Sequence, residues 1–268
     1  MKTRTVLCQP GKKIRLDRIP TDAEESSDGK KEAIELTESL RPRLRELQER
    51  FYAEGRRGLV VVFQAMDTGG KDGAVRSLFT GLDPAGVHVT GFKGPTSAEL
   101  AHDYLWRIHR QVPARGMIGV WNRSHYEDVL AVRVRKLVAD EIWKRRFAHI
   151  NDFERMLVDE GMVVVKYFLH ISHETQKNRL EERLADPSKH WKFDPADLED
   201  RLHWDAYQRA YEEIFEKCST DWAPWKIVPA DRKWARNLAL MQDLVGVLER
   251  LDPRPPAAKF DLSGIRIE

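Results

Sequence analysis

A glycine-containing loop at residues 64–73, Gln-Ala-Met-Asp-Thr-Gly-Gly-Lys-Asp-Gly, holds the first residues that could do chemistry. It lies between a short run of apolar residues and a stretch with helical periodicity. Gly69, Gly70 and Gly73 let the backbone approach an anion closely, and the start of a helix adds free N–H groups and partial positive charge. Lys71 adds a cation that can bridge phosphates. The pattern predicts a phosphate-binding loop, and residues 64–73 are called the phosphate loop below.

The phosphate loop departs from the Walker A pattern G-x-x-x-x-G-K-[ST] at two positions. Ala65 replaces the first glycine, and Asp72 replaces the Ser/Thr that binds Mg²⁺. Asp67 favours phosphate binding, because a carboxylate inside such a loop is useful when Mg²⁺ bridges it to phosphate oxygens. Two plainer alternatives remain. Asp67 suits an ordinary turn, in which Lys71 faces solvent, and Asp72 suits the first turn of a helix.

A second polar group follows the third predicted strand and consists of Asn122, Arg123, Glu127 and Asp128. Asn122 stands where a Walker B aspartate would end the strand, and Glu127 or Asp128 could serve in its place. Arg123 could neutralise the charge that develops on a transferred phosphoryl group. The plainer alternative is a structural ion pair between Arg123 and Asp128. A covalent phosphohistidine at His125 is not favoured, since a single histidine in a polar loop is weak support.

A basic, aromatic insertion at about residues 172–222 is the third feature. Its cations are Lys177, Arg179, Arg183, Lys189 and Lys192. Trp191 and Phe193 are expected to anchor the loop between them. Arg183 lies one helical turn beyond Arg179, so the two can line one face. A cationic flap over the phosphate loop would exclude water and grip a polyanion, whereas the alternative is a solvated charged face.

The elements that position these groups alternate between strand and helix. Strands are predicted over 59–63, 87–92, 117–121, 162–171 and 225–228, and helices between them. One helix is expected to begin near Pro42 or to bend there, and another to open at the capping-box pattern of Thr96 and Glu99. Such alternation implies a parallel sheet covered on both faces. The carboxyl ends of its strands should bring the two polar groups to one crevice.

Composition sets the class of protein. The chain has 268 residues, 41% hydrophobic and 33% charged, with a net charge of +2. A full core is therefore expected, and a disordered chain is excluded. Two cysteines are too few for a disulfide framework, and no apolar run reaches the roughly 18 residues of a membrane span. Without an apolar leader at the N-terminus, a cytoplasmic location is predicted.

These motifs together resemble the polyphosphate kinase 2 family over roughly residues 30–250. The matching stretches are 64–73, 95–100, 103–107, 122–129, 186–193, 197–201 and Trp204. The resemblance implies an α/β fold of the P-loop kinase type, similar to thymidylate kinases, with three layers, about five parallel strands and a helical lid at about 172–222. The kinase domain is then expected at 31–250. The polar composition of residues 1–30 predicts an N-terminal arm lying over the body, and residues 251–268 are expected to form an irregular tail.

The activity implied is phosphoryl transfer from inorganic polyphosphate to nucleotides, with Mg²⁺ or alternatively Mn²⁺ held by Asp67 and Asp128. The implied catalytic residues are Asp67, Lys71, Arg123 and Asp128. Those implied to bind nucleotide or phosphate are Gly69, Gly70, Asp72, Gly73, Asn122 and Glu127, and those implied to bind polyphosphate from the lid are Arg133, Arg179, Arg183 and Lys189.

Glu127 points to the subgroup that accepts both nucleoside mono- and diphosphates, AMP and ADP or their guanine counterparts. Members restricted to diphosphates tend to carry Asn there. The resemblance also implies a homo-oligomer, a dimer or a tetramer, with no nucleic-acid or membrane partner. Two alternatives are an ATP-dependent nucleotide kinase of the same fold and a non-enzymatic module that binds polyanions.

Overall fold

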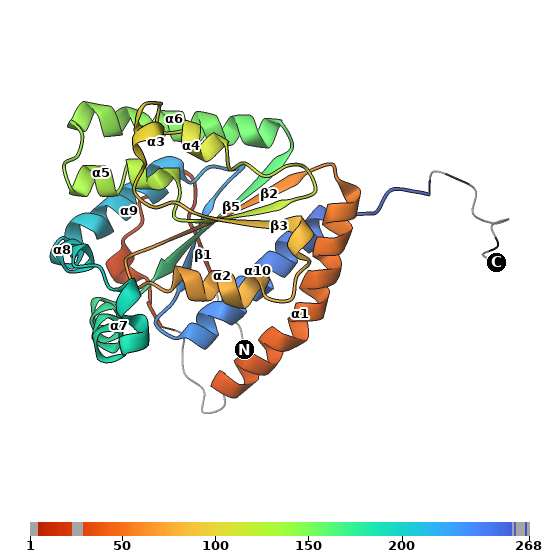
Figure 1. Cartoon of the computed structure of the whole chain (residues 1–268), viewed down its shortest axis with the longest axis horizontal. Coiled ribbons are helices and arrows are strands. Elements are labelled where there is room, and N and C mark those ends of the chain that lie inside the picture. The colour runs from red at the N-terminus through yellow and green to blue at the C-terminus, as the bar shows by residue number, and fades with distance from the viewer. Residues whose placement is uncertain (1–4, 23–28, 259, 261–265, 267–268) are drawn as a thin grey trace.

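A twisted six-stranded sheet forms the centre of the protein in the computed structural model, which describes residues 5–22, 29–258, 260 and 266 (Figure 1). The strand order is β1-β6-β5-β2-β4-β3. The strands are β1 (Val6–Leu7), β2 (Gly58–Ala65), β3 (Val87–Gly91), β4 (Ile118–Asn122), β5 (Met162–His170) and β6 (Trp225–Pro229). Five strands are parallel, as predicted, and only the two-residue β1 runs antiparallel, along β6.

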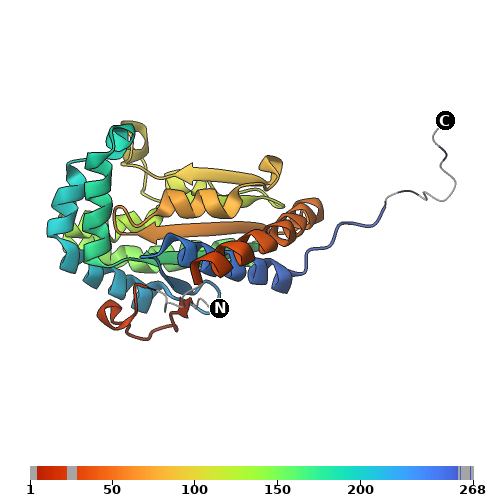
Figure 2. The ribbon, with the colours of Figure 1, turned by 90° about the horizontal axis from the view of Figure 1, so that it is seen from below.

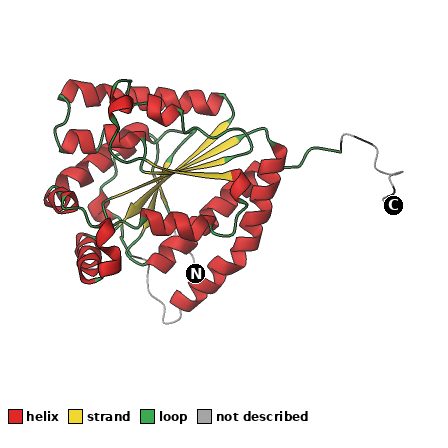
Figure 3. Cartoon of the chain, in the orientation of Figure 1, coloured by secondary structure: helices red, strands yellow, loops and turns green. Residues whose placement is uncertain are grey.

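Helices cover both faces of the sheet, so the fold has the three layers predicted (Figures 2 and 3). One face carries α1 (Gly29–Glu54), α2 (Lys71–Phe79) and α10 (Lys233–Leu251). The other carries α5 (Ala131–Val134), α6 (Asp140–Asp159) and α9 (Trp204–Cys218). All eight residues of β2 are buried, as expected of a central strand made of a continuous apolar run. None of the helices among the described residues is long and apolar enough to cross a membrane.

The N-terminal arm belongs to the body of the fold where it is described. Residues of β1 extend the sheet, and the short turn η1 (Leu16–Arg18) follows. Leu16 is buried, and its backbone N–H donates to Glu212 of α9 over 2.8 Å. Residues 1–4 and 23–28, also assigned to the arm, lie outside the described residues.

Two helices decide between or depart from the sequence-based expectations. Helix α1 begins well before Pro42 and runs through it, which excludes a helix start at Pro42. The helix expected from Thr96 is instead two single turns, α3 (Ser97–Leu100) and α4 (Trp106–His109). The capping box of Thr96 and Glu99 is present, but the Asp103 carboxylate accepts from the N–H groups of Leu105 and Trp106 and so starts a new turn. Leu100 is therefore 69% exposed and not part of the core.

The insertion divides into two parts with different environments. Helix α9 packs into the core through Tyr211, Ile214 and Phe215. Residues 173–202 stand beside the phosphate loop and are called the lid segment below (Figure 1). They form α7 (His173–Ala185), η4 (Pro187–Lys192) and α8 (Ala196–Leu202). Ser172 caps α7 as expected, but Trp191 is 78% exposed, so the prediction that it anchors this segment is wrong.

Candidate active site

The phosphate loop connects the end of β2 to α2 and needs glycine at two positions. Gly70 has a φ of +91°, which glycine adopts without strain, and a Cβ there would collide with the Arg236 guanidinium. A Cβ on Gly69 would lie 2.7 Å from the Met66 carbonyl oxygen and collide with Ala65. Thr68, with a φ of +59°, is held left-handed without being glycine. The backbone of the loop therefore turns tightly just before α2 begins.

Lys71 is buried inside this loop, so the alternative in which it faces solvent is wrong. Its side chain folds back, and Nζ donates to the Ala65 carbonyl oxygen over 3.0 Å. Burial lowers the pKa of Lys71, and the nearby Arg123 guanidinium lowers it further, while Asp67 and Glu127 oppose the shift. The ammonium group is therefore enclosed by the phosphate loop and held on its backbone carbonyl groups.

Asp67 and Arg123 join the two polar groups that the sequence placed at separate strand ends. Arg123 Nη2 donates to Asp67 Oδ1 over 2.7 Å, and the Arg123 backbone N–H donates to the Phe63 carbonyl oxygen on β2. Burial raises the pKa of Asp67, but Lys71 and Arg123 more than offset this and hold it below its ordinary value. The carboxylate is therefore charged at neutral pH, and the two loops share one crevice as predicted.

Glu127 and Asp128 lie on the turn η3 (His125–Asp128) but have different surroundings. Arg146 of α6 donates to the Asp128 carboxylate and to its backbone carbonyl, both over 3.0 Å, so an ion pair of Asp128 with Arg123 is not formed. Burial raises the pKa of Asp128 to about 6. Glu127 is the main cause of a raised pKa at Arg123. Glu127 is thus the acid of this turn that faces Arg123.

Asn122 and Asp72 link the end of β4 to the start of α2. Asn122 Nδ2 donates to Asp72 Oδ1 over 2.7 Å, and the ammonium group of Lys192, on η4, lies 3.6 Å from the other carboxylate oxygen. Asp72 therefore connects a strand, the phosphate loop and the lid segment.

Three side chains that sequence reasoning gave no loop-holding role grip the backbone of the phosphate loop. Arg236 of α10 donates to the Gly70 carbonyl over 3.1 Å, Arg179 of α7 to that of Thr68 over 3.1 Å, and Gln176 to that of Asp67 over 3.2 Å. Arg236 and Gln176 were not predicted as site residues at all. Burial lowers the pKa of Arg236 to about 10. A charged residue within the apolar pattern of the last helix was the signal that could have found Arg236.

The other predicted lid cations are engaged by the protein itself. Arg183 donates to Asp197 over 3.1 Å and to the Lys192 carbonyl over 3.3 Å, and Lys189 pairs with Asp186 over 2.8 Å. Arg133 lies on α5, where it pairs with Glu213 and stacks over Trp143 at 4.4 Å. The structure does not direct Arg183 and Arg179 toward one ligand, because Arg179 is turned into the phosphate loop.

A cavity of about 460 Å³, the loop cavity, opens between the phosphate loop and η3. Its charged lining residues are Asp67, Lys93, Glu99, Arg107, Arg123, Glu127, Asp128, Arg135, Arg146 and Asp200, and its apolar and aromatic ones include Phe92, Leu100, Tyr104, Leu137 and Tyr211. The lid segment contributes Asp200, whose carboxylate contacts Asp67 and receives two hydrogen bonds from Arg135. Sequence reasoning missed both Asp200 and Arg135.

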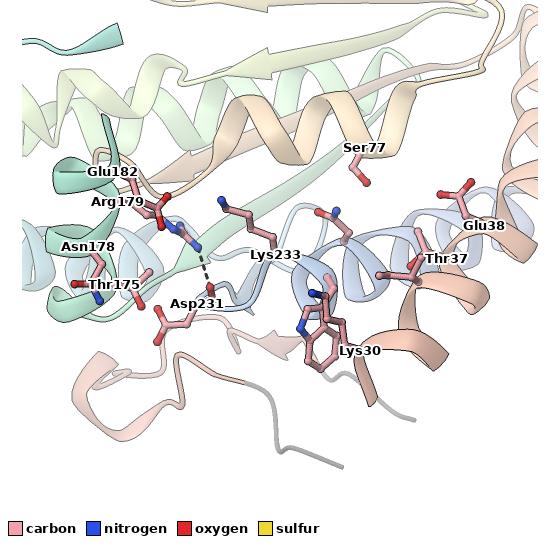
Figure 4. A pocket seen from close by; sticks show the side chains of 13 residues that line it. Lys30, Thr37, Glu38, Ser77, Thr175, Asn178, Arg179, Glu182, Asp231 and Lys233 are labelled. Carbon is pink, nitrogen blue, oxygen red and sulfur yellow. Dashed lines mark hydrogen bonds between the residues drawn. The ribbon is translucent and has the colours of Figure 1, made fainter. Parts of the chain in front are cut away.

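A second cavity of about 630 Å³, the helix cavity, lies among α1, α2, α7 and α10 (Figure 4). Its charged lining residues are Lys30, Glu38, Arg179, Glu182, Asp231 and Lys233. Arg179 connects it to the phosphate loop, because the guanidinium that lines the cavity also holds the Thr68 carbonyl. Figure 4 shows Lys233 directed between α2 and α7.

The residues around Asp67 suit a magnesium ion without forming a closed cage for it. Among the described residues, no group of three His, Cys, Asp or Glu side chains could hold a metal. Mg²⁺, however, typically uses one or two carboxylates together with phosphate oxygens and water. Asp67 and Asp200 offer adjoining carboxylates beside the phosphate loop, whereas the Asp128 carboxylate is bound by Arg146. The Mg²⁺ site at Asp67 and Asp128 stays a prediction.

Comparison with known proteins decides the family. The family model of polyphosphate kinase 2 (PPK2) matches residues 26–256. This chain belongs to the polyphosphate kinase 2 family. The resemblance inferred from the sequence is thereby confirmed, and so is the predicted P-loop kinase fold.

Two relatives and one solved structure show how far the family likeness extends. The chain is 50% identical over 261 residues to the AMP/ADP-polyphosphate phosphotransferase of Meiothermus ruber, covering 97% of this chain and 98% of the relative. It is 38% identical to the ADP-polyphosphate phosphotransferase of Rhodopseudomonas palustris, covering 94% and 91%. A crystal structure of polyphosphate kinase 2 from Arthrobacter aurescens superposes with a TM-score of 0.88 at 42% identity, covering 96% and 95% of the two chains.

Proposed function

We propose that this protein transfers phosphoryl groups from inorganic polyphosphate to AMP and ADP. The main support for the proposal is the site at the phosphate loop. There Lys71 is held inside the glycine-containing loop, and Arg123 pairs with Asp67. The family of the chain supports polyphosphate as the donor, and the names of its relatives support AMP and ADP as acceptors. Use of guanine nucleotides is a further expectation of the sequence.

Phosphoryl transfer requires mainly that the reactants be positioned and their charge neutralised. The N–H groups of the phosphate loop and Lys71 hold the phosphates, and Arg123 stabilises charge on the group in transfer. Mg²⁺, held by Asp67 together with Asp200 or Asp128, would supply further charge neutralisation when bound. No protein nucleophile is needed. His125 is fully buried and hydrogen-bonded to Glu154, so its ring is not accessible to accept a phosphoryl group.

We assign the acceptor nucleotide to the loop cavity. Its aromatic and aliphatic side chains, such as Tyr104 and Leu137, suit a nucleoside, and Lys93 and Arg107 suit its phosphates. Glu127, which faces Arg123, lies in the same cavity and is the residue on which acceptance of AMP as well as ADP was predicted.

We assign the polyphosphate chain to the helix cavity. Lys30 and Lys233 are exposed there, beside the buried Arg179. Three acids also line this cavity. Glu38 pairs with Arg41 over 2.7 Å, Asp231 accepts from the Ser172 N–H at the start of α7, and Glu182 lies on α7. Arg183 and Lys189 on the lid segment, and Arg133 on α5, remain candidates for contacts with the chain further along.

The activity is tested by incubating the protein with Mg²⁺, long-chain polyphosphate and either AMP or ADP, and then separating the nucleotides. The proposal expects ADP and ATP to form from AMP, and ATP from ADP, with polyphosphate as sole donor. The same reactions without metal, with Mg²⁺ and with Mn²⁺ test the cofactor. Conversion of AMP by ATP, with none by polyphosphate, would identify an ATP-dependent nucleotide kinase instead. Light scattering on the same preparation tests the predicted dimer or tetramer.

A further inference from the structure

A buried ion pair lies directly behind η3, the turn that carries Glu127 and Asp128. Lys166, in the middle of β5, places its ammonium group 2.6 Å from the Glu154 carboxylate of α6. The two side chains are 0% and 1% exposed. Neither residue lines the loop cavity or the helix cavity, so neither contacts a substrate in the proposed reaction.

This pair holds two consecutive side chains of η3. Glu154 Oε1 accepts from the Tyr126 hydroxyl over 2.8 Å and lies 3.1 Å from His125 Nε2. Lys166 Nζ also contacts the Tyr126 hydroxyl, at 2.9 Å, and donates to the Cys218 carbonyl over 2.7 Å. Residues 125 and 126 are thus drawn inward by one carboxylate and one ammonium group. The next two residues of the turn line the loop cavity.

The backbone entering η3 needs such a restraint. Arg123 has a φ of +64°, a left-handed conformation that is unfavourable for a residue with a side chain and persists only where the surroundings fix it. Its backbone N–H is held by β2, and the Ser124 hydroxyl that follows is bonded to Gln64 and to the Tyr126 N–H. The chain direction on the far side of the turn is fixed by the hydrogen bonds to Glu154 and Lys166.

Stability alone does not explain a fully buried ion pair. Removing two charges from water costs more than their attraction commonly returns, and apolar replacements of similar volume are often as stable or more so. The charged pair instead fixes the orientation of two side chains, because its hydrogen bonds to His125 and Tyr126 are directional.

We propose that Glu154 and Lys166 are positioning residues for phosphoryl transfer. By holding His125 and Tyr126, they keep Arg123 against Asp67 and Glu127 in the lining of the loop cavity, in the geometry that transfer requires. They act through η3 and touch no substrate. The proposal rests on the assignment of Arg123 and Glu127 to the reacting centre.

The molecule contains a matched control of the same chemistry. Lys226 of β6 pairs with Asp243 of α10 over 2.5 Å, and the Tyr167 hydroxyl donates to the same carboxylate over 2.6 Å. Tyr167 follows Lys166 along β5, so this second group of lysine, carboxylate and tyrosine lies on the opposite face of the sheet. Neither Lys226 nor Asp243 lines the loop cavity or the helix cavity.

The experiment compares two apolar double variants, Glu154→Leu/Lys166→Met and Asp243→Leu/Lys226→Met. Neither leaves a lone charge buried, so both should fold, which thermal melting checks before activity is measured well below the lower melting temperature. For ADP with polyphosphate, the first variant should lose about 10- to 100-fold in kcat, as a misplaced reacting group does, with KM for both substrates within about threefold. The control variant should keep kcat within about twofold.

Combination with Arg123→Ala shows whether the pair acts through the turn. Because both changes disturb the same contact, the triple variant should lose less than the product of the separate losses. Losses that multiply would overturn the positioning role, as would an equal kcat loss in the control. If Arg123→Ala lowers kcat while Glu154→Leu/Lys166→Met does not, the positioning role is contradicted and the proposed reacting centre stands. If Arg123→Ala retains full kcat, both the proposed reacting centre and the positioning role are contradicted.

Discussion

The loop cavity and the helix cavity are built differently. The loop cavity is bordered by short turns and strand ends, and its charges are paired with one another, as in the contacts of Arg123 with Asp67 and of Arg146 with Asp128. The helix cavity is bordered by four regular helices, and two of its cations, Lys30 and Lys233, stand on exposed positions. A pre-set lining suits a small substrate of fixed shape, whereas exposed lysines suit a repeating chain of charges.

Arg179 links the helix cavity to the backbone of the phosphate loop. The sequence predicted Arg179 on a polyphosphate-binding face. In the structure its guanidinium donates hydrogen bonds to the carbonyls of Thr68, Ala230 and Asp231. It therefore fixes the shape of the phosphate loop from the side of the helix cavity. With Arg236 it places two buried cations behind the loop, close enough that Arg179 contributes to the lowered pKa of Arg236.

The largest expected effect is at Lys71, the buried cation of the phosphate loop. Replacing Lys71 by alanine removes the cation inside the phosphate loop, which acts mainly as charge develops on the transferred group. Turnover of ADP with polyphosphate should fall about 10²- to 10³-fold. Circular dichroism and thermal melting should show an intact fold. Turnover near that of the wild type would show that the loop is not the reacting centre.

A smaller loss is expected where only the winding of the loop changes. Gly70→Ala puts a side chain at a φ of +91° and into the Arg236 guanidinium, so it should lower the free energy of unfolding by about 1–2 kcal/mol and turnover by about tenfold or more. Gly91→Ala on β3 is the control, because a Cβ there meets nothing within 4 Å. Equal losses in the two variants would mean that the loop does not require this conformation.

The helix cavity can be tested by the salt dependence of the donor. Polyphosphate carries a linear array of charges, so its binding should weaken as salt rises, by analogy with nucleic acids. Lys233→Ala should raise the apparent KM for polyphosphate a few-fold and make its dependence on salt shallower. Lys177→Ala is the control, since that exposed lysine of α7 lies beside Glu181 and lines neither cavity. Parallel salt plots for all three proteins would remove Lys233 from the donor path.

The last expected effect is on stability and its pH dependence, and it concerns an acid near the loop cavity. Burial, and then the charge of Asp67, raise the pKa of the Asp197 carboxyl to about 6. The folded protein therefore holds this proton more tightly than the unfolded chain, and ionisation costs stability progressively as pH rises from about 4 to 6. The cost reaches no more than about 3 kcal/mol.

Asp197→Asn removes that cost, so its melting temperature should gain on that of the wild type between pH 4.5 and 7. The gain would reverse if the ion pair with Arg183, at 3.1 Å, outweighed burial. In that case the melting temperature of Asp197→Asn minus that of the wild type would fall as pH rises from 4.5 to 7.

Much of the fold could be predicted because its signals are local. The buried run at β2, the glycines of the phosphate loop and the Ser172 cap each identify an element from a few neighbouring residues. The two polar groups could also be brought to one crevice, because parallel strands end at a common edge. Pro42 was ambiguous, and tertiary packing of α1 against α10 resolved it in favour of one continuous helix.

The partners of each charge could not be predicted, because they come from distant elements. Arg146 of α6 pairs with Asp128, and Asp200 of the lid segment contacts Asp67, although nothing in the sequence around Arg146 or Asp200 indicates these partners. Lys166 interrupts an apolar strand with a charge, and only the fold shows that Glu154 lies opposite. Long-range pairing of this kind decides which predicted residues act on substrate and which hold the site together.

The division of substrates between the two cavities is tested most directly by apparent KM values in two lysine variants. Lys93→Ala changes the loop cavity and Lys233→Ala the helix cavity, and both lysines are exposed, so the fold should survive. KM for ADP should rise a few-fold only in Lys93→Ala, and KM for polyphosphate only in Lys233→Ala. If both variants raised KM for the same substrate, or the pattern were reversed, the assignment of acceptor and donor would be contradicted.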